Sequence, residues 1–314
     1  MKFVSRSEYF SCNGTLPDTI VLAHMSKGHC RSNYTCLGEF FMGTHSRRSF
    51  MTSAAAGIVG IPLAHAAAPV PTKFSLGIQA FSLRKYSLDD ALRHTKELGF
   101  DAIEFYPKMF PITNDSSQIK TVLQKVRDQG LMISAHGVNK FTADSEANRK
   151  VFSFAKQAGI KILTADPSAD SFDNLEELVQ EFDIRIAIHN HGPGHRYSKV
   201  LDVLRAIENR DQRIGACADL GHYIRSAERP VEVIRLLKGR LYGIHLKDFA
   251  EMEKKTEGVI LGQGHLDVPA VFVSLEQVGF PEDGALSLEY EQNPENPLND
   301  IRQCVAVARK AMAL

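Results

Sequence analysis

From residue 74 onward the sequence alternates short β-rich runs with longer amphipathic segments, and this alternation limits the fold more than any other feature. Strands separated by helices pair in parallel, because every crossover has to cover one face of the sheet. The β-rich runs are residues 74–81, 102–106, 132–137, 161–166, 185–190, 214–220, 241–247 and 285–290. Eight such strand–helix units predict an α/β fold, a (β/α)8 TIM barrel.

An open, doubly wound sheet would show the same alternation. Nucleotide-binding sheets of that kind place a glycine-rich loop after the first strand, whereas this chain continues as Gln79-Ala-Phe-Ser-Leu83. Signals at helix ends support the individual units. Gly99 and Gly130 stand where C-terminal caps are expected, and Asp267 precedes Val268-Pro269 as an N-cap would. We therefore favour the barrel.

The segment before the barrel has a different character. A pair of arginines, Arg47 and Arg48, precedes a weakly apolar, alanine-rich stretch that ends in Ala66-Ala-Ala68. This arrangement is typical of a twin-arginine export signal. We predict an N-terminal extension and removable signal peptide at 1–68, a barrel domain at 69–314, and a periplasmic or otherwise exported protein. The true start codon stays open.

The composition disfavours two classes of partner. The chain has 37 basic and 37 acidic residues, and residues 69–314 carry more acidic than basic ones. A polyanion is a poor partner for such a surface, so we expect no nucleic acid. No apolar run reaches the about 20 residues that a membrane-spanning helix needs, so we expect no stable membrane insertion. The five cysteines show neither metal-knuckle nor disulfide spacing.

Polar residues gather at the strand ends. In a (β/α)8 barrel the active site lies at the C-terminal ends of the strands. Seven of the eight predicted strands end in ionisable residues, where an unpaired charge after an apolar run would cost free energy. These residues are Glu104, His136, Asp166, His189 with His191, Asp219 with His222, His245 with Lys247, and Glu289 with Glu291. Together they predict a polar site at the mouth of the barrel.

Four of these residues form a candidate metal site. Parallel neighbours lie about 4.8 Å apart, so side chains from consecutive strands can converge on one ion. Asp219, His245 and Glu289 end the sixth, seventh and eighth strands, and His189 on the fifth is placed as the fourth ligand. Mixed oxygen and nitrogen donors favour Mn, Zn, Co or Fe over Mg. We predict one divalent metal ion, with His191 as the alternative to His189.

Three motifs then become specific in combination. Asp-x-Gly-His, His-x-Lys-Asp and Leu-Glu-Tyr-Glu, in this order on strands six to eight, resemble the xylose isomerase-like TIM barrel superfamily. The sugar phosphate isomerase/epimerase branch, with its tagatose epimerases and inosose dehydratases, looks most similar. The resemblance covers about residues 74–314. It implies Asp219, His245 and Glu289 as metal ligands. Many members have a metal-bound, proton-transferring glutamate on strand five, where this chain has His189-Asn-His191.

The resemblance also implies chemistry on a sugar, keto-sugar or polyol. A metal would polarise the carbonyl while a base removes the neighbouring proton, giving an enediolate. We predict Glu289 as the base, Glu104 and His136 as acid or base on the opposite face, and Lys247 as the group that stabilises the oxyanion. The predicted substrate-binding residues are His191, His222 and Glu291. Isomerisation or epimerisation is the leading reaction, and loss of a hydroxyl by a dehydratase or lyase stays open.

Two hypotheses of other classes remain. Endonuclease IV-type enzymes share this barrel, but they use a larger histidine-rich set for three zinc ions and a DNA-binding surface. A non-catalytic exported sugar-binding barrel is the other alternative, although it would not need Asp219, His245 and Glu289. The substrate and the metal cannot be read from the sequence, and neither can the oligomeric state, a homo-oligomer included.

Overall fold

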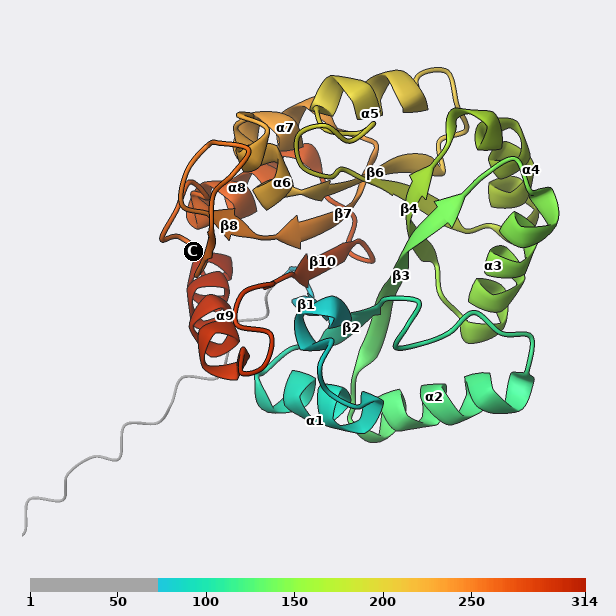
Figure 1. Ribbon diagram of the computed structural model, residues 1–314, viewed down its shortest axis with the longest axis horizontal. Coiled ribbons are helices and arrows are strands. Elements are labelled where there is room, and N and C mark those ends of the chain that lie inside the picture. Colours follow the sequence, from blue (N-terminus) through green and yellow to red (C-terminus); the bar gives the residue numbers. More distant parts are fainter. Residues whose placement is uncertain (1–72) are drawn as a thin grey trace, which may run out of the picture. The chain divides into compact units, whose positions relative to one another are not determined.

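The computed structural model describes residues 73–314 (Figure 1). The predicted signal peptide, and with it the boundary between 1–68 and 69–314, lies outside the described residues. The barrel strands are β1 (Gly77–Gln79), β2 (Ala102–Phe105), β3 (Met132–Phe141), β4 (Ile162–Pro167), β5 (Arg185–His189), β6 (Ile214–Asp219), β7 (Leu241–Leu246) and β10 (Ala285–Leu288). Each overlaps one of the predicted β-rich runs.

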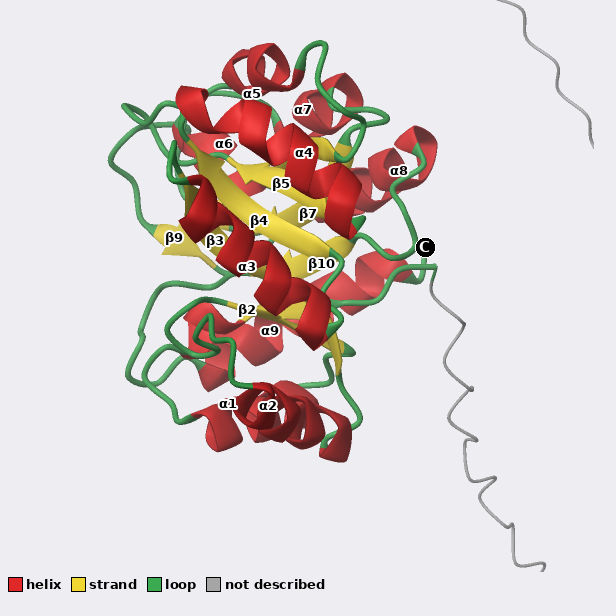
Figure 2. Ribbon diagram, turned by 90° about the vertical axis from the view of Figure 1, so that its right-hand side faces the viewer, coloured by secondary structure: helices red, strands yellow, loops and turns green. Residues whose placement is uncertain are grey.

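The helices follow the strands in sequence and surround them in space (Figure 2). They are α1 (Leu88–Glu97), α2 (Ser116–Asp128), α3 (Ser145–Ala158), α4 (Phe172–Phe182), α5 (Val200–Ile207), α6 (Leu220–Arg225), α7 (Pro230–Leu236), α8 (Val268–Val278) and α9 (Leu298–Met312). Short 3-10 turns, η1 (Ala80–Leu83) and η2 (Ala169–Ser171), follow β1 and β4. A small hairpin of β8 (Asp248–Phe249) and β9 (Gly258–Val259) follows β7.

The eight strands close in the order β1-β10-β7-β6-β5-β4-β3-β2, and every neighbouring pair is parallel. The (β/α)8 barrel that the alternation predicted is therefore confirmed. The expected helix ends are also present. Gly99 and Gly130 have φ of +85° and +63°, and the Asp267 carboxylate accepts the N–H of Ala270 at the start of α8.

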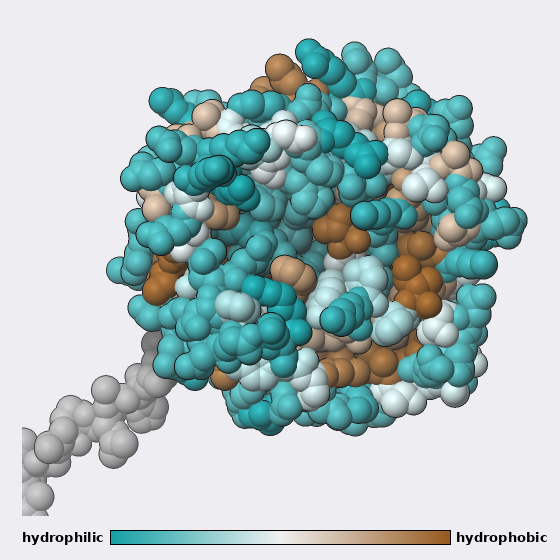
Figure 3. Space-filling model, viewed as in Figure 1, coloured by the Kyte–Doolittle hydropathy of each residue, from teal (hydrophilic) through white to brown (hydrophobic). Residues whose placement is uncertain are grey.

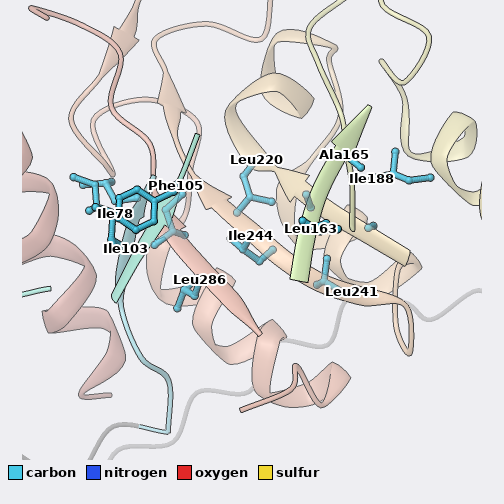
Figure 4. Packing of buried hydrophobic residues seen from close by; sticks show 14 of the residues in the cluster. Ile78, Ile103, Phe105, Leu163, Ala165, Ile188, Leu220, Leu241, Ile244 and Leu286 are labelled. Atoms are coloured by element: carbon cyan, nitrogen blue, oxygen red, sulfur yellow. The ribbon is translucent and has the colours of Figure 1, made fainter. Parts of the chain in front are cut away.

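The two faces of the strands carry different side chains. One face packs against the helices in a large apolar cluster, part of which Figure 4 shows, including Ile78, Ile103, Ile244 and Leu286. The barrel interior holds a separate cluster of mostly small residues, namely Ala135, Ile162, Ala187, Cys217 and Ala285. Small side chains at this level leave room for larger polar ones nearer the C-terminal ends of the strands.

The surface in Figure 3 is mostly hydrophilic, with a few apolar patches between polar side chains. Within residues 73–314, no helix combines the length and the hydropathy that a bilayer crossing requires.

Candidate active site

Four donor side chains meet at the C-terminal ends of β5, β6, β7 and β10. The donor atoms of His189, Asp219, His245 and Glu289 all lie within 4.8 Å of one another, and all four residues are buried. Nδ1 of His245 is 3.0 Å from Nε2 of His189 and 3.2 Å from Oε2 of Glu289. Oδ2 of Asp219 is 3.6 Å from the same His189 nitrogen. Two imidazoles and two carboxylates around one point form a set that could hold a divalent cation.

Strand register brings these residues together. Asp219 on β6 and Ser287 on β10 both pair with His245 on β7, one from each side. Glu289 lies two residues beyond Ser287, and its N–H donates to the carbonyl of Leu246. Because alternate residues of a strand share a face, these side chains all enter the barrel.

The two oxygens of Asp219 have separate tasks. Oδ1 accepts the N–H of His222 at 2.7 Å and so caps α6. Oδ2 points into the group of four donors, lies 3.0 Å from Nζ of Lys247 and accepts no well-directed hydrogen bond from any described residue. A buried carboxylate oxygen without a directed donor fits a cation ligand. Asn190 fixes the main chain of Asp219 through two hydrogen bonds of 2.7 and 3.0 Å.

Lys247 is the cation that the structure itself supplies. Its ammonium lies 2.6 Å from Oε2 of Glu289, 2.6 Å from Oε1 of Glu291 and 3.0 Å from Oδ2 of Asp219. Burial lowers the pKa of Lys247, but the three carboxylates outweigh this and raise it well above its usual value. Burial raises the pKa of Glu289, and Lys247 and His245 outweigh that effect and lower it. The lysine is therefore charged and the carboxylate ionised.

Glu104 lies beneath the four donors instead of across the mouth. Its side chain is fully buried, and its oxygens accept hydrogen bonds from Thr164 at 2.8 Å and Ser287 at 2.7 Å. Oε2 also lies 3.1 Å from Nε2 of His245, which leaves Nδ1 of that ring for the group of four. The predicted role of opposite-face acid or base does not suit this position. Glu104 instead orients His245, as carboxylates behind metal-bound histidines do.

His136 points away from the site, which corrects its predicted role. Its Nε2 lies 2.9 Å from the carbonyl of Phe110, and the ring packs against Phe110 and Phe154 in the helix layer. The cause is an extra residue in β3, where Ile103 pairs with Ile133 but Glu104 pairs with Ala135. A one-residue shift of register moves every later side chain to the other face of the sheet.

A cavity of about 390 Å³ opens above the four donors. One side is formed by the C-terminal end of β5, by α6 and by the segment after β10, and it contributes His189, His191, His222, Glu289 and Glu291. The other side is formed by the end of β1 with η1, by the segment after β2 and by β3, and it contributes Gln79, Phe81, Tyr106, Pro107, Gly137 and Val138. All three residues predicted to bind substrate therefore line the cavity. We call these two sides the charged wall and the uncharged wall.

Two histidines of the charged wall are held neutral. Burial lowers the pKa of His191, and together with the neighbouring His189, His195 and His222 it brings this pKa to about 3. Burial also lowers the pKa of His222 to about 3, against the attraction of Asp219. A neutral imidazole can accept a proton or a hydrogen bond from a substrate hydroxyl.

Asp166, the remaining strand-end carboxylate, does not line this cavity. It pairs with His195 at 3.4 Å and Arg196 at 3.2 Å and so anchors the loop after β5. A larger cavity of about 510 Å³ lies at the N-terminal ends of the strands, among Lys156, Asp183 and neighbouring residues. Active sites of (β/α)8 barrels lie at the other end, so we assign it no role.

Comparison with known proteins agrees with the fold and the motifs. A family model described as xylose isomerase-like TIM barrel matches residues 92–311. The chain belongs to this family. An inosose dehydratase of Clostridium botulinum is 27% identical over 148 residues, which cover 41% of this chain and 49% of that protein. The chain thus spans about half the length of the curated relatives it matches.

Solved structures extend the similarity over most of this xylose isomerase-like chain. An uncharacterised protein of Parabacteroides distasonis is 28% identical, with a TM-score of 0.60 and coverage of 76% of this chain and 99% of that one. A 3-keto-D-glucoside 4-epimerase of E. coli is 16% identical, with a TM-score of 0.60 and coverage of 76% and 99%. At that identity the second comparison shows a common fold alone.

Several supporting residues of this xylose isomerase-like site were not predicted from the sequence. Ser287 and Thr164 both donate to Glu104, and Asn190 holds the main chain of Asp219. Ser287 could have been found, because it stands two residues before Glu289 and shares its face of the strand. Asp248, in the His-x-Lys-Asp motif, accepts main-chain N–H groups of Phe249, Gly262, Gly264 and Leu266, and so anchors the loop between β9 and α8.

Proposed function

We propose that this protein is a metal-dependent enzyme that removes a proton next to the carbonyl group of a sugar, keto-sugar or cyclic polyol. The group of four buried donors at the floor of the cavity supports this proposal most strongly. The cavity volume of about 390 Å³ falls within the range of about 300–1,000 Å³ that is usual for ligand pockets. The family provides relatives that act on such compounds, among them the inosose dehydratases.

His189, Asp219, His245 and Glu289 would hold the metal, and their mixed donors favour Mn, Zn, Co or Fe over Mg. A divalent cation bound there would supply Lewis acidity, which polarises a substrate carbonyl and stabilises the anion that proton loss creates. A carboxylate oxygen of Glu289 takes the proton. The Lys247 ammonium donates to the developing oxyanion, and His191, His222 and Glu291 orient the hydroxyls.

Within this class, the arrangement of the walls favours loss of water over epimerisation. Epimerisation by two bases needs proton-transfer groups on both faces of the substrate. In the cavity lining, carboxylates and imidazoles come from the charged wall, and the uncharged wall offers the Gln79 amide and the Tyr106 phenol. Burial raises the pKa of Tyr106, so its phenol stays protonated. Removal of a proton and departure of a hydroxyl from one face need only the charged wall.

The isomerase or epimerase remains the second candidate, because the shared fold includes a 3-keto-D-glucoside 4-epimerase. Phosphodiester cleavage is less well supported. One group of at least three metal-binding side chains occurs in the part of the chain that the structure describes, and its four residues are too few for three zinc ions.

One experiment separates these reactions. Purified protein is analysed for bound metal, then incubated in D2O with an inosose and with a 3-keto-D-glucoside, and the products are followed by NMR. A dehydratase releases one water and forms an enol that tautomerises to a 1,2-diketone, whereas an epimerase returns the epimer with deuterium at one carbon. A sugar-binding barrel without catalysis binds the compounds and exchanges nothing. Protein without metal, or a His189→Ala variant with undiminished metal, would contradict the proposed site.

Export through the twin-arginine pathway is proposed from the sequence of residues 1–68. Replacing Arg47 and Arg48 by lysine should keep an uncleaved precursor in the cytoplasm, which cell fractionation and immunoblotting would detect. N-terminal sequencing of the exported wild type should start near position 69. Undiminished export of the double variant would refute the signal.

A further inference from the structure

The Lys247 ammonium shares its oxygens with the predicted metal site. Two of its three carboxylate partners, Asp219 and Glu289, belong to the group of four donors. The oxygens concerned are Oδ2 and Oε2, which also lie within 3.8 and 3.2 Å of Nδ1 of His245. A divalent ion bound by these oxygens and by His245 would therefore face the ammonium at close range. Two cations a few ångströms apart in a buried site repel strongly.

Glu291 is the partner that lies outside the group of four. Its side chain is 38% exposed, and its Oε1 accepts a hydrogen bond of 2.6 Å from Nζ of Lys247. Its main chain is fixed independently, because Arg84 donates to the Glu291 carbonyl at 2.8 Å. Glu291 therefore offers the ammonium a negative partner on the cavity side of the metal-binding oxygens.

Gly221 provides the space that the lysine stem occupies. A Cβ at this position would lie 2.6 Å from Cγ of Lys247 and 2.9 Å from its Cβ and Cδ. This contact explains why the Asp-x-Gly-His motif has glycine at this position, since any larger residue would displace Lys247. The side chain is four carbons long and can shift its ammonium by rotation near its end.

We infer that Lys247 and the metal ion compete for Asp219 and Glu289, and that Glu291 holds the Lys247 ammonium when the ion is bound. The inference rests on the proposed function, because it presupposes metal binding by the group of four. It assigns Glu291 a positioning role in addition to contact with substrate. Lys247 then stands beside the substrate oxygen only after metal has entered.

The test measures binding of Mn²⁺ and Zn²⁺ to EDTA-treated protein by titration calorimetry. Lys247→Met should bind the metal roughly tenfold or more tightly, because a competing charge is gone. Glu291→Gln should bind it more weakly by a similar factor, because the ammonium loses the partner to which it withdraws. In the Lys247→Met background, Glu291→Gln should change the affinity little, since Glu291 acts through the lysine.

The Lys85–Glu295 ion pair supplies matched controls. Its 2.6 Å contact is as short as the Lys247–Glu291 contact, and both side chains are exposed. Lys85→Met and Glu295→Gln should leave metal affinity unchanged. Metal-free Lys247→Met should also unfold at a lower temperature than the wild type and gain more from added metal, because Asp219 and Glu289 lose their counter-ion.

Three results would overturn the inference. Weaker metal binding by Lys247→Met would show that the lysine supports the ion. An equal loss from Glu291→Gln in both backgrounds would show that Glu291 attracts the ion directly. If Lys247→Met is insoluble, an unchanged metal affinity of Glu291→Gln would contradict the inference. Wild-type protein that binds neither metal would refute the proposed function itself, which is a different outcome.

Discussion

The charged wall and the uncharged wall are built from the same kind of strand–helix unit, yet they differ in how their side chains are satisfied. On the charged wall His189, Glu289 and Glu291 all contact other ionisable groups. On the uncharged wall Phe81 and Tyr106 contact each other edge to face, with ring centroids 5.5 Å apart. The charged wall thus gathers ionisable side chains that neutralise one another, and the uncharged wall offers an apolar surface against which a substrate can pack. The comparison predicts that chemistry depends on the first wall and substrate fit on the second.

Glu289→Gln should produce the largest effect, because it removes the base from the charged wall and keeps its size. General-base loss typically lowers a rate by about 10²–10⁴. We expect metal-loaded Glu289→Gln to bind substrate but to lose exchange of the proton next to the carbonyl to this extent, as NMR in D2O would measure. Glu295→Gln serves as the control. Near-wild-type exchange would leave Glu289 as a ligand only and move the base to His191.

Glu104→Gln tests whether Glu104 only orients His245 beneath the charged wall or also takes part in proton transfer. Replacing a carboxylate behind a metal-bound histidine typically lowers metal affinity by about 10–100-fold. We expect a loss of that size in calorimetric titration, with exchange activity recovering at high metal concentration. Full metal affinity together with lost net turnover would contradict the positioning role. It would return Glu104 to the acid–base role that the sequence first suggested.

Phe81→Ala probes the uncharged wall. An aromatic contact is worth about 0.5–1.5 kcal/mol beyond area burial, so we expect KM to rise roughly two- to tenfold. Turnover at saturation should stay close to that of the wild type, because the lost contact is made equally before and during the reaction. Steady-state kinetics on the substrate found by the NMR panel would measure both constants. A fall in kcat without a rise in KM would contradict the assignment of substrate fit to the uncharged wall.

Replacement of His136 should have the smallest effect, and we expect it to change the stability of the fold and not the activity. Burial lowers the pKa of His136 below its ordinary value of 6.5. Below about pH 6.5 the His136 imidazole is therefore protonated in the unfolded chain but stays neutral in the folded one. The free energy of unfolding consequently falls as the pH drops. His136→Gln should flatten the decline of the unfolding temperature between about pH 7.5 and 5.5. The control is exchange activity, which the metal-loaded variant should keep; an unchanged decline would contradict the assignment.

The barrel and the convergence of His189, Asp219, His245 and Glu289 were predictable from the sequence. A buried parallel strand carries alternate side chains to the same face, so polar residues at its C-terminal end are delivered to the barrel mouth. Strand limits were less predictable. The first run extends to residue 81, but β1 ends at Gln79, because the Gln79 side chain accepts the N–H of Phe81 and starts η1.

The failures have a common physical cause, which is register. Ser134 has no partner on β2, and nothing in the amino-acid composition of β3 marks it as the extra residue. The sequence therefore does not show that the side chain of His136 points out of the barrel. Glu104 faces inward as predicted, but its depth depends on how the strands are staggered around the barrel. Alternation identifies the face of a side chain, and stagger sets the level at which it meets its neighbours.

Asp248 has a consequence for how this barrel can be altered. Its buried carboxylate receives the main-chain N–H groups of Gly262, Gly264 and Leu266, and a Cβ at Gly264 would lie 2.6 Å from Oδ1 of Asp248. Insertions there would break several of these bonds at once. The turn between β8 and β9 carries no such constraint from Asp248. Residues 251–256 are held by other contacts, since Arg225 donates to the Lys254 carbonyl and the Glu251 N–H donates to Thr256. Loop grafts meant to recruit new substrates should therefore disturb less in residues 251–256 than in residues 262–266.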